Sequence, residues 1–334
     1  MARRLRILSA ISFPLWLPPG VPITPTQFSA KKKSTQKRTP TDADIRGNER
    51  DFVIVQLING LAYGGLLYVV AVGLVLIFGL RQVVNFAHGS LFMLGAYVGY
   101  VISFYAGFWA GLVVAIAALG ILGSLLDIAV FGPLRHRGPM TTVLVTFGLA
   151  LILEDFAQAI WGKGLRLQQP PPFLSGTVAI FGDSFPVYRL AVIAMAAIVC
   201  LGLAIWMRKT RVGLFVRASS VDPEGTAMQG VNTDRLSILV VGLGTSLSGL
   251  AGVIAAPLLS LSPSMGSYVL IDSFIVVVLG GIGSFSGAFL AAILIGQIHN
   301  LGVIFVPSLA AVIPLALMSL VLMWRPSGLA GTAA

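Results

Sequence analysis

The stretch from Val55 to Tyr97, VQLINGLAYGGLLYVVAVGLVLIFGLRQVVNFAHGSLFMLGAY, joins an apolar run to a polar, glycine-flanked interruption at Asn85, His88 and Gly89. A helix needs about 20 apolar residues to cross a bilayer. Lipid cannot satisfy free backbone amides and carbonyls, so irregular backbone at membrane depth is tolerated only inside protein or beside water. The stretch therefore predicts a membrane helix followed by a break that lines a polar pathway.

Long runs without Asp, Glu, Lys or Arg recur along the chain, at 52–80, 82–126, 190–207, 236–271 and 273–324. Charged residues make up only 10% of the chain, against roughly 25% in soluble domains. These observations predict an all-α, polytopic membrane helical bundle and exclude a soluble globular protein.

Glycine and proline clusters and charges divide the chain into nine helical candidates. They cover 53–80, 89–106, 108–131, 140–161, 187–207, 236–258, 267–282, 287–304 and 308–324. The seventh is short and rich in glycine, which favours a broken or re-entrant segment. We therefore expect eight or nine full spans.

The net charge of +10 is concentrated in residues 1–50, where Lys and Arg are interrupted by Ser, Thr and Pro. We expect little fixed structure in this basic extension, and we place the membrane domain at 51–331. The rest of the chain offers no nucleic-acid-binding module, so the excess points to the membrane surface or to topology and not to nucleic acid.

Basic residues in the short connections predict the orientation of the helices. Arg135 and Arg137 follow the third candidate, and further basic residues lie between Arg208 and Arg235. Both connections are therefore expected in the cytoplasm, with the first helix beginning outside. This orientation leaves the basic tail on the side that the charge rule disfavours.

The connection 208–235 contains the signals of a short helix. Asp222 is a natural N-cap, Pro223 suits the first helical position, Glu224 complements the helix dipole and Gly230 can end the helix. Such a helix either lies at the lipid surface, with Arg211 and Arg217 near phosphates, or docks onto a soluble partner.

Four ordered motifs across residues 52–331 resemble the permeases of branched-chain amino acid ABC importers, H-type (LivH-type). They are Thr210-Arg-x-Gly213…Arg217-Ala218…Asp222 with Glu224-Gly-Thr-Ala227-Met-Gln-Gly230, Asn85-Phe-Ala-His88-Gly89…Gly95-Ala-Tyr97, Asp272-x-Phe274…Gly280-Gly281-Ile-Gly283-Ser284…Gly287-Ala288, and Arg325-Pro-Ser-Gly-Leu329. The chain departs from the family at Ile128 and Gly132, where arginines are usual, and at Gly225 and Thr226, where alanines are usual. Residues 1–50 lie outside the resemblance.

The resemblance implies a bacterial inner-membrane transport subunit that is not itself an enzyme and binds no cofactor. The implied partners are a second, M-type permease, two ATPase subunits that bind ATP-Mg and a periplasmic binding protein that delivers leucine, isoleucine, valine or a related small amino acid. It assigns coupling to the ATPase to seven residues: Arg211, Gly213, Arg217, Asp222, Glu224, Ala227 and Gly230.

The polar residues within the apolar runs have both structural and functional interpretations. Asn85 and His88 either satisfy the backbone freed by the break, which is the simpler interpretation, or contact the substrate. Asp272 is either a helix N-cap or an intramembrane charge. The candidate pathway set is Asn85, His88, Gly89, Asp272, Gly280, Gly281, Gly283 and Ser284.

Several other kinds of site are disfavoured by the sequence. Gly280, Gly281 and Gly283 have no following Lys-Ser/Thr, so close helix packing explains them better than a phosphate loop. His299 has no second His or acid at ligand spacing and Cys200 is the single cysteine, so we predict no metal site.

Two other functional classes remain as alternatives. An ion-coupled secondary transporter requires acids within the membrane, for which Asp127 and Asp272 are the candidates. An intramembrane enzyme requires paired catalytic groups, and His88 has no obvious partner in the sequence.

Overall fold

The computed structural model describes residues 42–180 and 183–330. The chain divides into a small unit, Met1–Ile45, and a main unit, Arg46–Ala334, which holds the elements discussed below. Most of the basic extension expected at 1–50 lies outside the described residues. From Asp42 onward the chain is helical, because α1 begins there.

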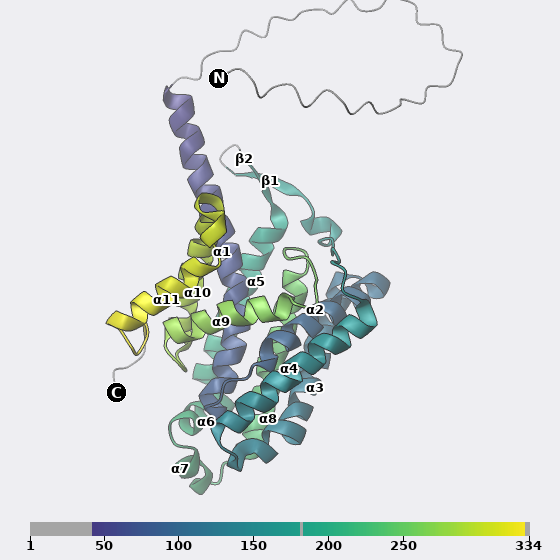
Figure 1. Ribbon diagram of the computed structural model, residues 1–334, viewed down its shortest axis with the longest axis vertical. Coiled ribbons are helices and arrows are strands. Elements are labelled where there is room, and N and C mark those ends of the chain that lie inside the picture. Colours follow the sequence, from purple (N-terminus) through teal and green to yellow (C-terminus); the bar gives the residue numbers. More distant parts are fainter. Residues whose placement is uncertain (1–41, 181–182, 331–334) are drawn as a thin grey trace, which may run out of the picture. The chain divides into compact units, whose positions relative to one another are not determined.

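Figure 1 shows the arrangement of the helices. Their bounds are α1 (Asp42–Arg81), α2 (Ala87–Ala106), α3 (Phe108–Leu126), α4 (Pro139–Trp161), α5 (Val187–Lys209), α6 (Arg211–Val221), α7 (Pro223–Met228), α8 (Thr233–Ala255), α9 (Met265–Gly280), α10 (Phe285–Phe305) and α11 (Val312–Trp324). Short π and 3-10 turns occupy Asp127–Phe131 (η1), Pro133–His136 (η2), Pro172–Leu174 (η3) and Pro307–Leu309 (η4). A hairpin of β1 (Thr177–Ile180) and β2 (Asp183–Pro186) is antiparallel, with Val178 opposite Phe185.

The predicted all-α polytopic bundle is confirmed. Seven helices of the described part are long and apolar enough to cross a membrane. The other two predicted helices, α9 and α11, are apolar but shorter, with 16 and 13 residues. Two elements were not predicted from the sequence: the hairpin in the connection between α4 and α5, and the amphipathic helix α6.

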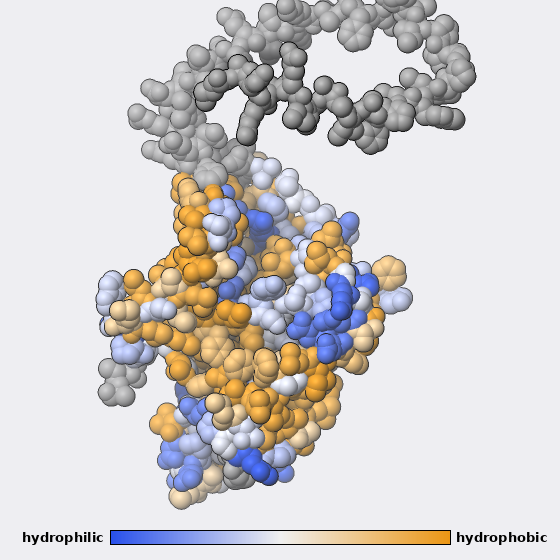
Figure 2. Space-filling model, in the orientation of Figure 1, coloured by the Kyte–Doolittle hydropathy of each residue, from blue (hydrophilic) through white to orange (hydrophobic). Residues whose placement is uncertain are grey.

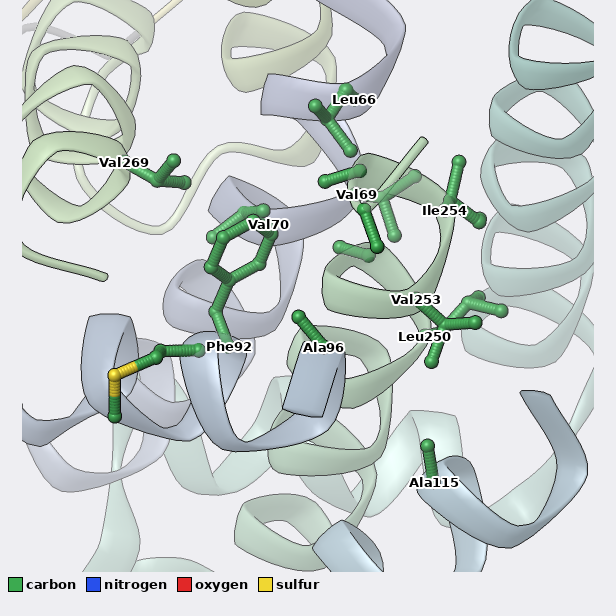
Figure 3. Packing of buried hydrophobic residues seen from close by; sticks show 14 of the residues in the cluster. Leu66, Val69, Val70, Phe92, Ala96, Ala115, Leu250, Val253, Ile254 and Val269 are labelled. Carbon is green, nitrogen blue, oxygen red and sulfur yellow. The ribbon is translucent and has the colours of Figure 1, made fainter. Parts of the chain in front are cut away.

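The interior of the main unit is built where α8 crosses α1, α2 and α3 through small residues. A Cβ on Gly95 of α2 would overlap the backbone of Gly249 of α8, with its carbonyl oxygen 2.9 Å away, and one on Gly244 of α8 would lie 2.8 Å from the carbonyl oxygen of Gly73 of α1. Small residues permit this close approach of membrane helices. Figure 3 shows side chains from these helices meeting in one apolar cluster, among them Phe92 and Ile254.

Burial separates inner from outer helices. In the most apolar part of α1, 78% of the residues are buried, against 11% in α4. Large apolar side chains such as Leu144 of α4 and Ile198 of α5 are exposed. The outer helices therefore present the surface that lipid or other subunits would cover.

Both basic connections lie at the same end of the main unit. One cavity is lined by the end of α1, by α6 and α7 and by the start of α8, and a second joins the end of α1 to Arg137 before α4. In Figure 2 hydrophilic residues lie at this end, a band of hydrophobic residues lies next to them, and a second hydrophilic patch lies further up the same face. The hairpin lies at the opposite end (Figure 1).

Candidate functional site

We call residues 211–230, to which the resemblance assigns coupling, the coupling segment. It begins with α6, which turns back tightly on the end of α5. Thr210 caps α6, its Oγ1 accepting a hydrogen bond from the Gly213 N–H at 3.0 Å. Gly213 is buried, and a Cβ there would lie 2.5 Å from the Met207 carbonyl oxygen. Arg217 donates to the same Met207 carbonyl. Gly213 and Arg217 therefore hold α6 against α5, a structural role that the sequence pattern alone did not reveal.

The following helix, α7, forms with the predicted start and stop. Asp222 is its N-cap and accepts from the Gly225 N–H at 2.9 Å. Pro223 and Glu224 occupy the first turn, and α7 ends at Met228. Gly230 follows with a φ of +82°, a conformation that suits glycine. Asn232 then caps α8 by accepting from the Arg235 N–H at 2.9 Å.

The outer face of α7 combines a charge with small and apolar side chains. Glu224 and Ala227 are exposed, Met228 is 83% exposed, and Val221 just before the helix is 88% exposed. Apolar side chains this exposed at a hydrophilic end suit a surface that a partner covers. Arg211, also exposed, lies one helix earlier at the start of α6.

Between α7 and the membrane helices lies a cavity of about 550 Å³. Its lining comes from the end of α1, from the α6–α7 corner and from the start of α8: Leu80, Arg81, Gln82, Ser219, Asp222, Pro223, Glu224, Thr233 and Ser237. Seven of these nine side chains carry hydrogen-bonding or charged groups, and the other two are Leu80 and Pro223. The coupling segment is therefore connected to the spans through a polar space next to Arg81.

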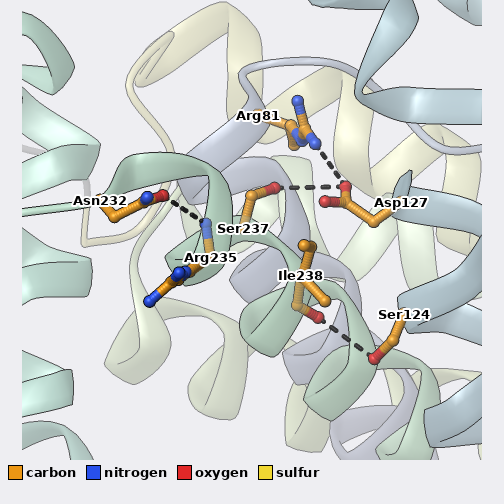
Figure 4. Close-up of polar contacts among 7 residues, drawn as sticks. All are labelled: Arg81, Ser124, Asp127, Asn232, Arg235, Ser237 and Ile238. Atoms are coloured by element: carbon orange, nitrogen blue, oxygen red, sulfur yellow. Dashed lines mark hydrogen bonds and ion pairs between the residues drawn. The ribbon is translucent and has the colours of Figure 1, made fainter.

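A buried ion pair lies beside this cavity. The Arg81 guanidinium at the end of α1 is 2.5 Å from Asp127 Oδ1 at the start of η1, and only 2% of the Asp127 side chain is exposed. Ser237 of α8 donates to the same carboxylate oxygen at 3.2 Å, and Figure 4 shows the three side chains converging. The ion pair ties together α1, the end of α3 and the helix that follows the coupling segment.

The pairing of Arg81 with Asp127 was missed by the sequence analysis. A signal for it exists: Arg81 and Asp127 are the two charges that bound the uncharged run 82–126. An isolated charge among apolar helices needs a partner, so these two are natural complements. The tertiary structure decides which charges meet, because α2 and α3 bring Asp127 back to the end of α1.

The break between α1 and α2 re-enters the bundle. Gln82, with a φ of +53°, directs the chain away from α1. At the far side of the break, Nε2 of His88 lies 3.1 Å from the Val70 carbonyl oxygen. Val70 precedes Arg81 by about 16 Å along α1, at 1.5 Å per residue. The chain therefore returns to the middle of α1 within the break, so that the first turn of α2 packs there.

Asn85 satisfies the backbone of this break, as the simpler interpretation predicted. Its Oδ1 accepts from the Ala87 N–H at 3.0 Å, and the Phe86 N–H donates to Thr146 of α4 at 3.3 Å. The break borders a cavity of about 290 Å³ that reaches Arg81, Asn85, Arg137 and Thr146. Asn85 is thus a proposed pathway residue that lies beside an opening at this end.

His88 and Gly89 are packing residues in this structure. His88 is fully buried, and its carbonyl oxygen accepts from Ser248 of α8 at 3.1 Å. A Cβ on Gly89 would overlap the Gly266 carbonyl of α9. The two residues hold the first turn of α2 where it meets α1, α8 and α9.

The N-cap interpretation of Asp272 is wrong. Helix α9 begins at Met265, so Asp272 lies inside it, where its Oδ2 accepts from the Tyr63 hydroxyl at 2.7 Å. The hydroxyl belongs to α1, far away in sequence. Asp272 therefore lies within an apolar helix, and the remaining interpretation is an intramembrane charge.

The glycine cluster after α9 forms a packed turn. A Cβ on Gly280 would lie 2.5 Å from the backbone of Gly287 of α10. Gly281 and Gly283 have positive φ values of 98° and 82°, and Ser284 caps α10 by accepting from the Gly287 N–H at 3.1 Å. Close packing and a turn account for this motif. Gly283 also borders a cavity of about 310 Å³ together with Gln82 and Arg217.

Comparison with known proteins identifies relatives over most of the chain. A family model described as "branched-chain amino acid transport system / permease component" matches residues 56–322. The chain is 26% identical to the high-affinity branched-chain amino acid transport system permease protein BraD of Pseudomonas aeruginosa, over 83% of this chain and 95% of that protein. It is also 26% identical to the corresponding protein LivH of Escherichia coli, over 84% and 96% of the two chains. The ribose import permease protein RbsC of Escherichia coli matches 75% of this chain at 27% identity.

Proposed function

Because the chain belongs to the branched-chain amino acid transport system permease family, we propose that it is a transmembrane subunit of an ATP-driven importer for leucine, isoleucine, valine or a related small amino acid. The match covers nearly the whole length of the relatives that are named for branched-chain amino acid transport. A ribose permease is also related to this chain. The substrate class is therefore the part of the proposal that is tested directly below.

The proposed complex contains this chain, a second permease of the M type, two ATPase subunits that bind ATP-Mg and a periplasmic binding protein, in the inner membrane of a bacterium. The chain itself is a transport component. One coupling segment per permease fits a complex in which two permeases engage two ATPases. Transport then proceeds by alternating access, in which nucleotide and loaded binding protein shift the population between two arrangements of the helices.

The connected route from α7 to the helix break carries this proposal. Glu224, Ala227 and Met228 offer an exposed surface for the ATPase. A displacement of α7 reaches α8 through the short connection capped by Asn232. From Ser237 it reaches Asp127 and Arg81, and so the end of α1 and the break that follows.

The ion-coupled alternative is supported less well by the same contacts. Asp127 is neutralised by Arg81 and hydrogen-bonded to Ser237, so Asp272 is the acid that such a mechanism would have to use. Helix α7, with its exposed apolar face, has no role in that alternative.

The deciding experiment is reconstitution of the complex in proteoliposomes with the binding protein outside and ATP inside. Uptake of radiolabelled leucine that requires both ATP and the binding protein is the expected result. Uptake driven by a sodium or proton gradient without the ATPase would overturn the proposal. Uptake of ribose, with none of leucine, isoleucine or valine, would reassign the substrate.

A further inference from the structure

Three polar side chains from three helices meet away from the coupling end. Asp272 of α9 accepts from the Tyr63 hydroxyl of α1 at 2.7 Å. The Tyr63 ring packs against the ring of His299 of α10, with centroids 4.6 Å apart. Nδ1 of His299 is buried and has no hydrogen-bond partner among the described residues. We call Tyr63, Asp272 and His299 the acidic cluster.

The charge of Asp272 is isolated in the sequence and only partly covered in the fold. No other Asp, Glu, Lys or Arg occurs between residues 236 and 324. The Asp272 side chain is only partly buried, and among the described residues no cation forms an ion pair with it. Its neighbours on α9 include Tyr268 and Ile271, which are 71% and 51% exposed.

A carboxylate in this position is not expected to face lipid. A charged side chain within an apolar helix is costly in hydrocarbon, so such groups face water or other polar groups. We therefore expect the open side of the acidic cluster to face a water-filled space or another polar surface in the assembled transporter.

More polar side chains continue from the cluster along α1. Asn59, one turn before Tyr63, accepts from Arg189 at the start of α5 and donates to Gln56 at 3.3 Å. Gln56 in turn accepts from Asn300 of α10, at 3.1 Å. A cation and a carboxylate thus border the same face of α1, about one to two turns apart at 3.6 residues per turn.

We propose that the acidic cluster lines the translocation pathway and that Asp272 binds the ammonium group of the amino acid in transit. This inference rests on the proposed function, because it assigns a place to that substrate. A free amino acid carries an ammonium and a carboxylate group, so it complements a face that offers Asp272 and, toward the hairpin end, Arg189. Tyr63 positions the carboxylate through its hydroxyl, and His299 supplies a further polar edge.

Thiol labelling tests whether water reaches the acidic cluster. In a Cys200→Ser background, Asp272→Cys in the assembled, reconstituted transporter is exposed to a small membrane-impermeant methanethiosulfonate reagent, with and without ATP. Ile198→Cys is the matched control, because Ile198 is 68% exposed on the outer surface of α5 and is expected to face lipid. Labelling at 272 in at least one nucleotide state, without labelling at 198, is expected. Absence of labelling at 272 in both states, or equal labelling at the two positions, would overturn the proposal.

Uptake measurements test the charge. Asp272→Asn should lower the rate of leucine uptake roughly tenfold or more, the size expected for losing one hydrogen bond to a charged group. Asp272→Glu should restore much of the rate, and Tyr63→Phe should reduce it less than Asp272→Asn. Wild-type uptake by Asp272→Asn, or equal losses in Asp272→Asn and Tyr63→Phe, would instead assign Asp272 a purely structural role. Failure of the proposed function is seen separately, as absence of leucine uptake by the wild-type complex.

Discussion

The carboxylate of Asp127 lies 2.5 Å from the guanidinium of Arg81, and the pair is almost closed to solvent. Because Ser237 donates to the same carboxylate oxygen, this contact joins the end of α1 to η1 and to the helix that leaves the coupling segment. It thereby links the helix that follows α7 to the end of α1, directly before the break.

Removing one member of this pair should destabilise the protein strongly. Asp127→Ala leaves the Arg81 guanidinium buried without its partner, which costs about 3–5 kcal/mol in comparable buried pairs. Thermal unfolding in detergent measures the loss. Asp155→Ala is the control, because Asp155 is exposed on α4 and its removal should change stability little. A double variant, Arg81→Met with Asp127→Leu, should recover much of the loss; equal stability of all variants would contradict the importance of the pair.

A bulky side chain on α7 should uncouple the transporter. Ala227→Trp fills the exposed face of α7 and Gly230→Trp also strains a φ of +82°, so both should abolish stimulation of ATP hydrolysis by the loaded binding protein while the chain still inserts. ATPase activity of the reconstituted complex and a pull-down of the ATPase provide the measurement. Ser175→Trp, at an exposed position in the connection that carries the hairpin, is the control. Wild-type stimulation in both α7 variants would favour the lipid-surface interpretation of this helix.

The stability of α7 should depend on the side-chain oxygen of its N-cap, Asp222, and less on the charge of that residue. Asp222→Ala removes the acceptor for the Gly225 N–H, which costs typically about 1 kcal/mol of helix stability, whereas Asn retains an acceptor. Hydrogen exchange of residues 223–228 should therefore accelerate in Asp222→Ala and stay close to wild type in Asp222→Asn. Equal exchange in both variants would rule out the capping role.

A large side chain at Gly89 should disrupt the bundle at the crossing of α2 with α9. Gly89→Leu meets the Gly266 backbone, which cannot move aside as a side chain can, and overpacking typically costs about 1–3 kcal/mol. Gly148→Leu on α4 is the control, since no atom lies within 4 Å of a Cβ built there. Thermal stability and leucine uptake of the two variants should differ clearly, and similar values would refute the special role of Gly89.

The positions of the membrane helices were predictable because they depend on local composition. Uncharged runs, each ended by glycine, proline or a charge, account for most apolar helices of the described residues, and a side-chain cap with a proline accounts for α7. The exceptions are α4, which contains Glu154 and Asp155, and α9, which contains Asp272. Helix α6 was missed because it is held by the packing of Val212 and Val216 with Trp206 and Met207 at the end of α5, and this packing is not a local property. The hairpin was missed because its strands are only four residues each.

The sequence by itself determined the class of the protein, the helix positions and the local geometry of the coupling segment, since burial in lipid and capping act over one to a few turns. Only the tertiary structure decided which isolated polar residues meet. Arg81 and Asp127 pair across three helices, Tyr63 reaches Asp272 across 209 positions of the chain, and His88 turns into the packed interior against Val70. Each contact arises because glycine-lined crossings bring distant helices close, and the partner that a crossing selects depends on the whole bundle.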